Sequence, residues 1–199
     1  MEKLLLTKDA AIELLHQNIE NKNLRKHCYA VGKVLSAYHD YYKSRGKNTG
    51  TLSKDQWEIT GILHDADWEK TADEPKIHTL KLLEWLEKYD VPEEMLQVFK
   101  SHNNRSTHLR EPETIFEWTL ECCDELTGFI VAVALMRPNK KLSEVEVSSV
   151  LKKFKHKEFA RAVDRNQISQ CEEKLGIKLE EFVQISLKAM QENSDLLGL

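Results

Sequence analysis

A histidine and an aspartate stand side by side where a hydrophobic segment of the chain ends. The stretch GILHDADWEK, residues 61–70, passes from apolar residues into His64 and Asp65 and then reaches a second acid, Asp67. Burying an imidazole or a carboxylate without a partner is costly in free energy. The pair therefore predicts a compensating partner in the folded chain.

Other potential ligands fall where predicted helices begin, end or turn toward the middle of a bundle. Among the eight histidines, the ones placed in this way are His27, His64, His78 and His102. The others have no place in this pattern and are expected at the surface: His16, His39, His108 and His156. Asp124 interrupts the apolar segment FEWTLECCDELTGFIVAVAL. A bound cation would compensate a carboxylate buried there, and imidazole together with carboxylate suits iron, manganese, zinc or nickel. Helical bundles build internal metal sites from single ligands on separate helices.

The segments that must position these residues all predict helices. Apolar residues recur at helical spacing over nine stretches, approximately residues 8–20, 23–43, 53–63, 77–88, 90–102, 113–135, 143–153, 164–175 and 179–197. Thr7 is expected to cap the first helix, and the pairs Ser53/Gln56 and Ser143/Glu146 match capping boxes that would begin two others. Persuasive strand alternation is missing from the sequence, so we expect an all-α fold.

The composition predicts one globular protein that binds neither nucleic-acid polymers nor membranes. Of 199 residues, 41% are hydrophobic and 31% charged, and glycine (7) and proline (4) are scarce. This length supports one sizeable core, and the scarcity of glycine and proline favours helices. The net charge of -4 argues against nucleic acid or anionic membranes as the main partner. The longest apolar runs fall short of a membrane span or a signal-peptide core.

The cysteines indicate a cytoplasmic protein. Cys28, Cys122, Cys123 and Cys171 have no CxxC spacing. We expect all four to be reduced and mostly buried thiols, as is usual in a reducing compartment.

The order of the potential ligands resembles that of the HD-domain superfamily of metal-dependent phosphohydrolases. The resembling series is His27, His64, Asp65, His78, His102 and Asp124. The segment KIHTLKLLEWLEKYDVPEEMLQVFKSHN is similar to two-metal members, such as the HD-type diadenosine tetraphosphate hydrolases and the cyclic-di-GMP phosphodiesterases. The resemblance covers approximately residues 20–135. It implies an HD-domain helical bundle over residues 1–140, with residues 141–199 as a C-terminal helical extension packed on the same domain, as in a smaller bacterial group of predicted HD hydrolases.

The resemblance also implies a mechanism. One or two divalent or transition metal ions would bind, with Asp65 bridging them, and two ions about 3.5–4 Å apart clamp a phosphate and activate water at neutral pH. Asp67 is expected to orient the water or to protonate the leaving oxygen. Many relatives carry a lysine where this chain has Trp68, so Lys70 and Arg105 are the candidates for contact with the phosphate. The expected substrate is a small phosphorylated molecule, and a nucleotide is the favoured class.

Several alternatives stay open at the level of sequence. Because Trp68 replaces that lysine, the chain could be a metal- or nucleotide-binding sensor with weak turnover. A di-iron oxygenase is a third function, known among relatives of this superfamily. A single histidine at a helix end can be a simple cap, Asp67 can cap the next turn, and Arg105 can be a solvated charge.

Overall fold

Helices make up nearly all the regular structure of the computed structural model, which describes residues 3–199. They are α1 (Lys8–Asn18), α2 (Lys22–Ser44), α3 (Lys54–Leu63), α4 (Trp68–Thr71), α5 (Leu80–Leu86), α6 (Glu93–His102), α7 (Asn104–Thr107), α8 (Ile115–Leu135), α9 (Val147–Phe154), α10 (Arg165–Leu175), α11 (Leu179–Glu192) and α12 (Ser194–Leu197). Two 3₁₀ turns, η1 (Pro75–Ile77) and η2 (Leu142–Glu144), complete the helical elements. The expected all-α class is confirmed.

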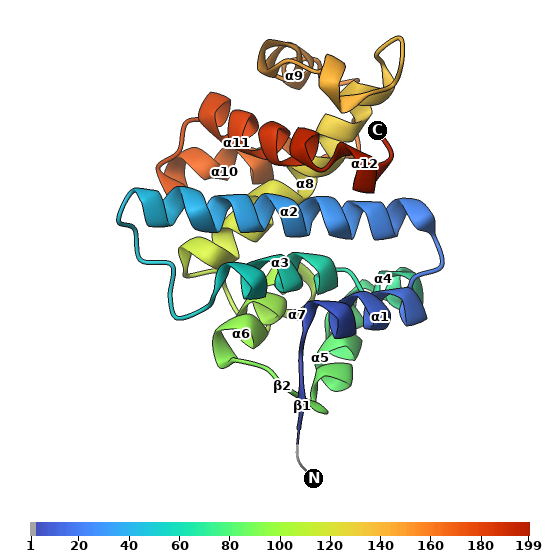
Figure 1. Ribbon diagram of the computed structural model, residues 1–199, viewed down its shortest axis with the longest axis vertical. Helices are drawn as coiled ribbons and strands as arrows, with labels where there is room; N and C mark the ends of the chain where they lie inside the picture. Colours follow the sequence, from blue (N-terminus) through green and yellow to red (C-terminus); the bar gives the residue numbers. More distant parts are fainter. Residues whose placement is uncertain (1–2) are drawn as a thin grey trace.

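One small strand pair was not expected. β1 (Leu4–Leu5) pairs in parallel with β2 (Tyr89–Asp90), with Leu4 opposite Tyr89. Strands of two residues are too short to produce an alternating pattern in the sequence. The pair joins the start of the chain to the connection between α5 and α6 (Figure 1).

Helix α2 crosses the middle of the molecule and packs against most of the other long helices (Figure 1). Helix α3 lies along one side of α2, while α11 lies along the other side and α8 crosses behind it. Tyr38 of α2 donates a 2.8 Å hydrogen bond to the carbonyl of Phe182 in α11, and the two rings stack 4.8 Å apart. The C-terminal helices therefore pack on the same core as α2.

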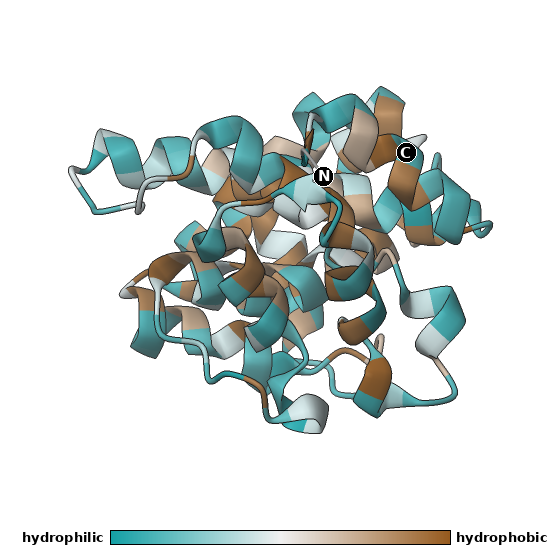
Figure 2. Ribbon diagram, turned by 90° about the horizontal axis from the view of Figure 1, so that it is seen from below, coloured by the Kyte–Doolittle hydropathy of each residue, from teal (hydrophilic) through white to brown (hydrophobic). Residues whose placement is uncertain are grey.

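Apolar and polar residues share each helix, so the apolar faces can meet in the interior (Figure 2). The largest fully buried side chains include Trp57, Tyr38, Phe99, Phe129 and Phe182. The four cysteines are all free and buried, as expected. None of the helices in residues 3–199 is both long enough and apolar enough to cross a membrane.

Two of the predicted helix starts are confirmed. The Thr7 side chain accepts a hydrogen bond from the Ala10 amide and caps α1. Ser53 and Gln56 form the reciprocal capping box that begins α3. These caps satisfy amide groups that have no partner within the helix.

The predicted capping box at Ser143/Glu146 is wrong. Ser143 lies inside η2, and Glu146 is itself the residue that precedes α9. Leu142 and Val145 are buried on either side of this turn. Their burial fixes the turn against the core and delays the start of the helix to Val147.

Two further expectations are corrected. The helix predicted from residue 77 begins only at Leu80, because His78 is extended and Thr79 has a left-handed backbone (φ 72°). His39, expected at the surface, is buried with its ring edge-on to Trp57 at 5.6 Å. His39 continues the Leu35, Tyr38, Tyr42 stripe of α2, so its burial follows from helical spacing.

Helices α2 and α3 approach closely through two glycines. A Cβ atom on Gly61 would lie 2.6 Å from the Gly32 Cα, and one on Gly32 would lie 2.9 Å from the Glu58 carbonyl oxygen. Real Cβ atoms cannot approach backbone atoms this closely, so each position requires hydrogen in place of a side chain. This contact brings the two backbones together just before α3 ends at the His64-Asp65 pair.

Helix α8 begins at a capping box that the sequence analysis did not identify. Thr114 and Glu117 form it, and the Glu117 carboxylate also accepts from Arg110 Nε (2.6 Å) and the Glu113 amide (3.0 Å). Burial raises the pKa of Glu117, but Arg110 and the backbone amides outweigh burial and hold it below its usual value. The ionised side chain therefore stabilises the start of α8.

Replacing Gly61 by alanine should force α2 and α3 apart. We expect Gly61→Ala to lower the free energy of unfolding by about 1–3 kcal/mol, the usual cost of overpacking. Gly128→Ala in α8 is the control, because a Cβ atom there has no neighbour within 4 Å. Alanine at that helical position should instead stabilise by up to about 1 kcal/mol. Urea unfolding measures both, and equal effects would contradict the proposed contact.

Replacing Glu117 by glutamine should destabilise the protein in a pH-dependent way. Because the folded pKa of Glu117 lies below its unfolded value, its contribution is fully present above about pH 4.3 and disappears as the pH falls through the folded pKa. We expect Glu117→Gln to cost about 1.5–3 kcal/mol at pH 7, and less below pH 4. The exposed partner Glu113 supplies the control, since Glu113→Gln should cost under about 0.5 kcal/mol in urea unfolding at either pH. A pH-independent difference for Glu117→Gln would count against the assignment.

Candidate metal centre

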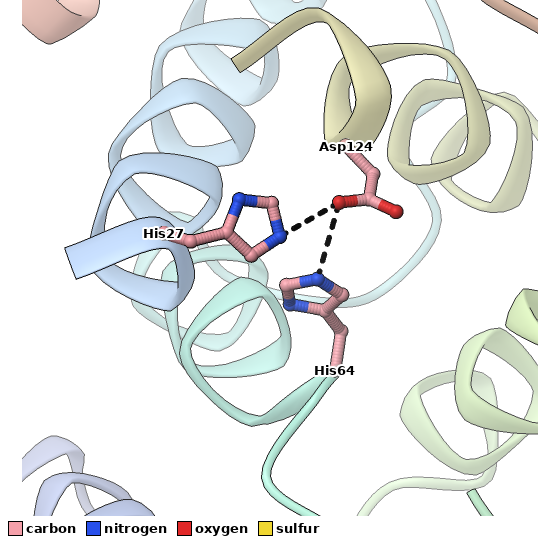
Figure 3. Close-up of side chains that lie close together, drawn as sticks. All are labelled: His27, His64 and Asp124. Carbon is pink, nitrogen blue, oxygen red and sulfur yellow. Dashed lines mark ion pairs between the residues drawn. The ribbon is translucent and has the colours of Figure 1, made fainter. Parts of the chain in front are cut away.

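The six predicted ligands converge from separate elements. His27 lies in the second turn of α2, His64 and Asp65 follow α3, His78 lies between η1 and α5, His102 ends α6, and Asp124 is in the middle of α8. Figure 3 shows His27 and His64 pointing toward Asp124 from different helices. The predicted convergence of these residues is therefore present in the fold.

The first half of the cluster consists of His27, His64 and Asp124. Asp124 Oδ1 lies 2.8 Å from His27 Nε2 and 3.4 Å from His64 Nε2. Asp65 Oδ2 lies 3.7 and 3.5 Å from the same two nitrogens. One oxygen of Asp65 therefore faces this group.

The second half consists of His78 and His102. Asp65 Oδ1 lies 3.2 Å from His78 Nε2 and 3.3 Å from His102 Nε2. Asp65 consequently presents one carboxylate oxygen to each half of the cluster. This is the position expected of a residue that bridges two ions.

The hydrogen bonds behind two of the rings determine which nitrogen faces the centre. His64 Nδ1 donates to the Gly61 carbonyl at 2.7 Å, and His78 Nδ1 donates to Asp67 Oδ1 at 2.7 Å. Since a carbonyl and a carboxylate only accept, Nδ1 carries the proton in both rings. The Nε2 atoms are therefore free to act as ligands, the pattern that orients histidines in metal sites.

The Nδ1 atoms of the other two rings face polar groups at longer distances. His27 Nδ1 lies 3.3 Å from the Thr127 hydroxyl, and His102 Nδ1 lies 3.5 Å from Glu121 Oε1. All four imidazoles thus have Nδ1 directed at a polar group and Nε2 directed at Asp65, and the Nε2 atoms of His27 and His64 also face Asp124.

The carboxylates of the cluster are ionised. Burial raises the pKa of Asp65, but His64, His102 and His78 outweigh burial and hold it well below the usual range. Burial likewise opposes ionisation of Asp124, and the nearby His27 and His64 hold its pKa below the usual range. Burial lowers the pKa of His102, yet Asp65 and Glu121 raise it well above the usual value. The imidazoles beside the carboxylates thus retain protons, and a bound cation would displace these protons.

A buried nitrogen that makes no hydrogen bond supports a cation at this place. His64 is fully buried, and its Nε2 atom makes no hydrogen bond to the described residues. Two carboxylates and four imidazoles form a donor set that suits first-row transition metals and zinc. Two overlapping groups of ligand atoms, His27/His64/Asp124 and His64/Asp65/His102, each fit around one point. The residues present therefore fit the expected ions.

Asp67 does not face the centre, in contrast to its expected catalytic role. It is fully buried, one of its oxygens accepts from His78 Nδ1, and the other accepts from the Leu82 amide at 3.1 Å. With both oxygens engaged behind His78, Asp67 is placed to orient a ligand. It is not placed to exchange protons with a substrate.

The two candidates for phosphate contact have different positions. Lys70 donates to the Asn18 side chain at 2.5 Å, and it does not line the cavity beside the cluster. Arg105 does line that cavity, which has a volume of about 270 Å³, and pairs with Asp164 at 2.9 Å. Trp68 also lines it, with its ring edge-on to His78 at 5.0 Å. Of the two, the structure brings only Arg105 to the cavity.

Several further residues surround the cluster and were not predicted from the sequence. Glu121 and Glu125 of α8 and Gln167 of α10 line the cavity. Glu121 lies three residues before Asp124, so helical spacing could have identified it. Asn103 donates to the His78 carbonyl at 3.1 Å and fixes that segment against the end of α6. That hydrogen bond joins segments 25 residues apart, and no sequence pattern predicts it.

Comparison with protein-family models, with curated proteins and with solved structures returned no match.

Removing the charge behind His78 should weaken metal binding. We expect Asp67→Asn to reduce the affinity of one ion about 10- to 100-fold, the usual effect of losing a partner of a ligating histidine. The second ion, held by the His27/His64/Asp124 group, should bind nearly as before. Titration with Mn²⁺ or Zn²⁺, followed by calorimetry, measures the two steps. The control is Asp73→Asn, at an exposed aspartate. Unchanged affinity for both ions would contradict the positioning role.

Proposed function

We propose that the protein is a metal-dependent phosphohydrolase of the HD-domain type, which cleaves a phosphoester or phosphoanhydride bond. The observation that carries this proposal is the position of Asp65. It offers one oxygen to the His27/His64/Asp124 group and the other to the His78/His102 group. The resemblance of the ligand order to two-metal HD-domain proteins supports the same function.

The bound ions would supply Lewis acidity and would lower the pKa of water. The chain itself holds the ligands in place. The His64 and His78 rings are oriented by the Gly61 carbonyl and by Asp67. In the reaction, a water oxygen forms a bond to phosphorus and the bond from phosphorus to the leaving oxygen breaks. The proton released by water passes to the leaving group or to solvent.

The open side of the cluster is acidic. Asp65, Asp124, Glu121 and Glu125 line the cavity, and Arg105 is the one permanently charged cation among its described residues. A phosphate would therefore meet net repulsion until cations are bound. Metal loading and phosphate binding are expected to be coupled for this reason.

The function can be tested with protein purified without chelator. We expect a transition metal by elemental analysis, and metal-dependent phosphate release from an aryl phosphate or from a nucleotide in a panel. Asp65→Asn should reduce kcat/KM about 1,000-fold or more, corresponding to several kcal/mol of lost transition-state stabilisation. Asp73→Asn is the control at an exposed aspartate.

The same assay separates the alternatives. Activity that survives in Asp65→Asn would contradict the proposal and indicate a contaminant. Tight binding without turnover would favour the sensor. Iron with a requirement for oxygen would favour the oxygenase.

A further inference from the structure

A second, apolar cavity begins at the His27 ring. It has a volume of about 320 Å³ and lies between α2 and α8, with the end of the chain over it. Six of its ten lining residues are apolar, and we call it the apolar groove: Ala30, Gly128, Val131, Leu135, Leu197 and Leu199. The other four are Asn23, Lys26, His27 and Thr127.

The apolar groove and the metal cluster lie on one continuous face of α8. Asp124, Gly128, Val131 and Leu135 are spaced by four, three and four residues, which places them along the same side of a helix. Asp124 belongs to the cluster and the other three line the groove. A ligand that reaches along this face would contact both.

His27 joins the two regions. Its Nε2 atom faces Asp124, while its Nδ1 atom faces the Thr127 hydroxyl, which lies in the lining of the groove. The His27 side chain is 23% exposed, whereas His64 is fully buried. The cluster can therefore also be reached at its His27 edge, where the groove begins.

The chemistry of the groove favours an apolar group. A nucleoside presents a base and ribose hydroxyls that need hydrogen-bond partners, and leaving such groups unpaired is costly. Apolar residues outnumber the polar residues Asn23, Lys26, His27 and Thr127 in the wall, and Leu135 is 50% exposed.

We propose that the substrate is a phosphate compound with an apolar chain or ring, and that this group lies in the apolar groove while the phosphate lies against the metal cluster. The proposal rests on the proposed function, and it replaces the expected nucleotide with a different substrate class. The volume of the groove is at the low end for ligand pockets. It therefore fits a short alkyl chain or a single ring.

Gly128 offers a way to fill the groove. A Cβ atom added there has no neighbour within 4 Å, so a larger side chain would extend into the open space without displacing the fold. Gly128→Leu also replaces glycine with a good helix former. Ser148→Leu introduces the same side chain at an exposed position of α9, outside the groove, and serves as the control.

The test measures binding and does not depend on turnover. Methyl-, butyl- and hexylphosphonate are titrated into Mn²⁺-loaded protein by calorimetry, with adenosine monophosphate for comparison. We expect the Kd to fall about four-fold for each methylene buried, the ratio that corresponds to about 0.8 kcal/mol. This dependence should be lost in Gly128→Leu and retained in Ser148→Leu.

The outcomes separate the two proposals. Phosphonates that bind with equal affinity at every chain length would overturn the substrate class and leave the phosphohydrolase proposal standing. The same holds if adenosine monophosphate binds more tightly than hexylphosphonate, or if Gly128→Leu keeps the chain-length dependence. If neither the phosphonates nor adenosine monophosphate bind to the loaded protein, both proposals fail.

Discussion

Two buried carboxylates, Asp65 and Asp124, constrain the arrangement of the helices. Asp65 and Asp124 are ionised although they are mostly excluded from water, and such groups require positive charge nearby. Four imidazoles supply partners, yet the same rings also direct Nε2 atoms at a common centre. Replacement of shared protons by cations would satisfy both carboxylates at once. Whether protonated imidazoles or bound cations supply the positive charge, helices that are distant in sequence must meet at one place.

The close contact of Gly32 with Gly61 controls how they meet. His27 precedes Gly32 by five residues in α2, and His64 follows Gly61 by three residues at the end of α3. Because the two backbones touch at the glycines, the His27 and His64 rings lie 5.1 Å apart between centroids. Side chains at these two positions would widen this distance and separate the first half of the cluster. Packing and metal geometry are thus constrained by the same contact.

The sequence was informative where a physical rule is local. Helical spacing predicted the helices, and the cost of burying His64, Asp65 and Asp124 pointed to a polar cluster in the core. The roles of Asp67 and Lys70 could not be obtained in this way, since each depends on a neighbour from another segment, His78 and Asn18.

Backbone conformation was equally inaccessible from the pattern of residues. Thr79 adopts a left-handed φ of 72°, which is unfavourable for a β-branched residue. This turn follows His78 directly and separates it from α5, and the Asn103 side chain holds the His78 carbonyl from the end of α6. Strained backbone of this kind persists only where surrounding contacts over-determine it. Tertiary contacts, and not local propensity, therefore set the orientation of His78.

Charge balance connects the two proposals. Arg105 is already paired with Asp164, and four carboxylates also line the cavity beside the cluster: Asp65, Glu121, Asp124 and Glu125. Protein side chains alone thus provide little attraction for a phosphate, and the ions must reverse the local charge before it can bind. Such a site would select poorly among phosphate compounds, because the ions would interact similarly with each of them. Discrimination must then come from the rest of the substrate, and the apolar groove beside His27 is the nearby surface that can supply it through burial of an apolar group.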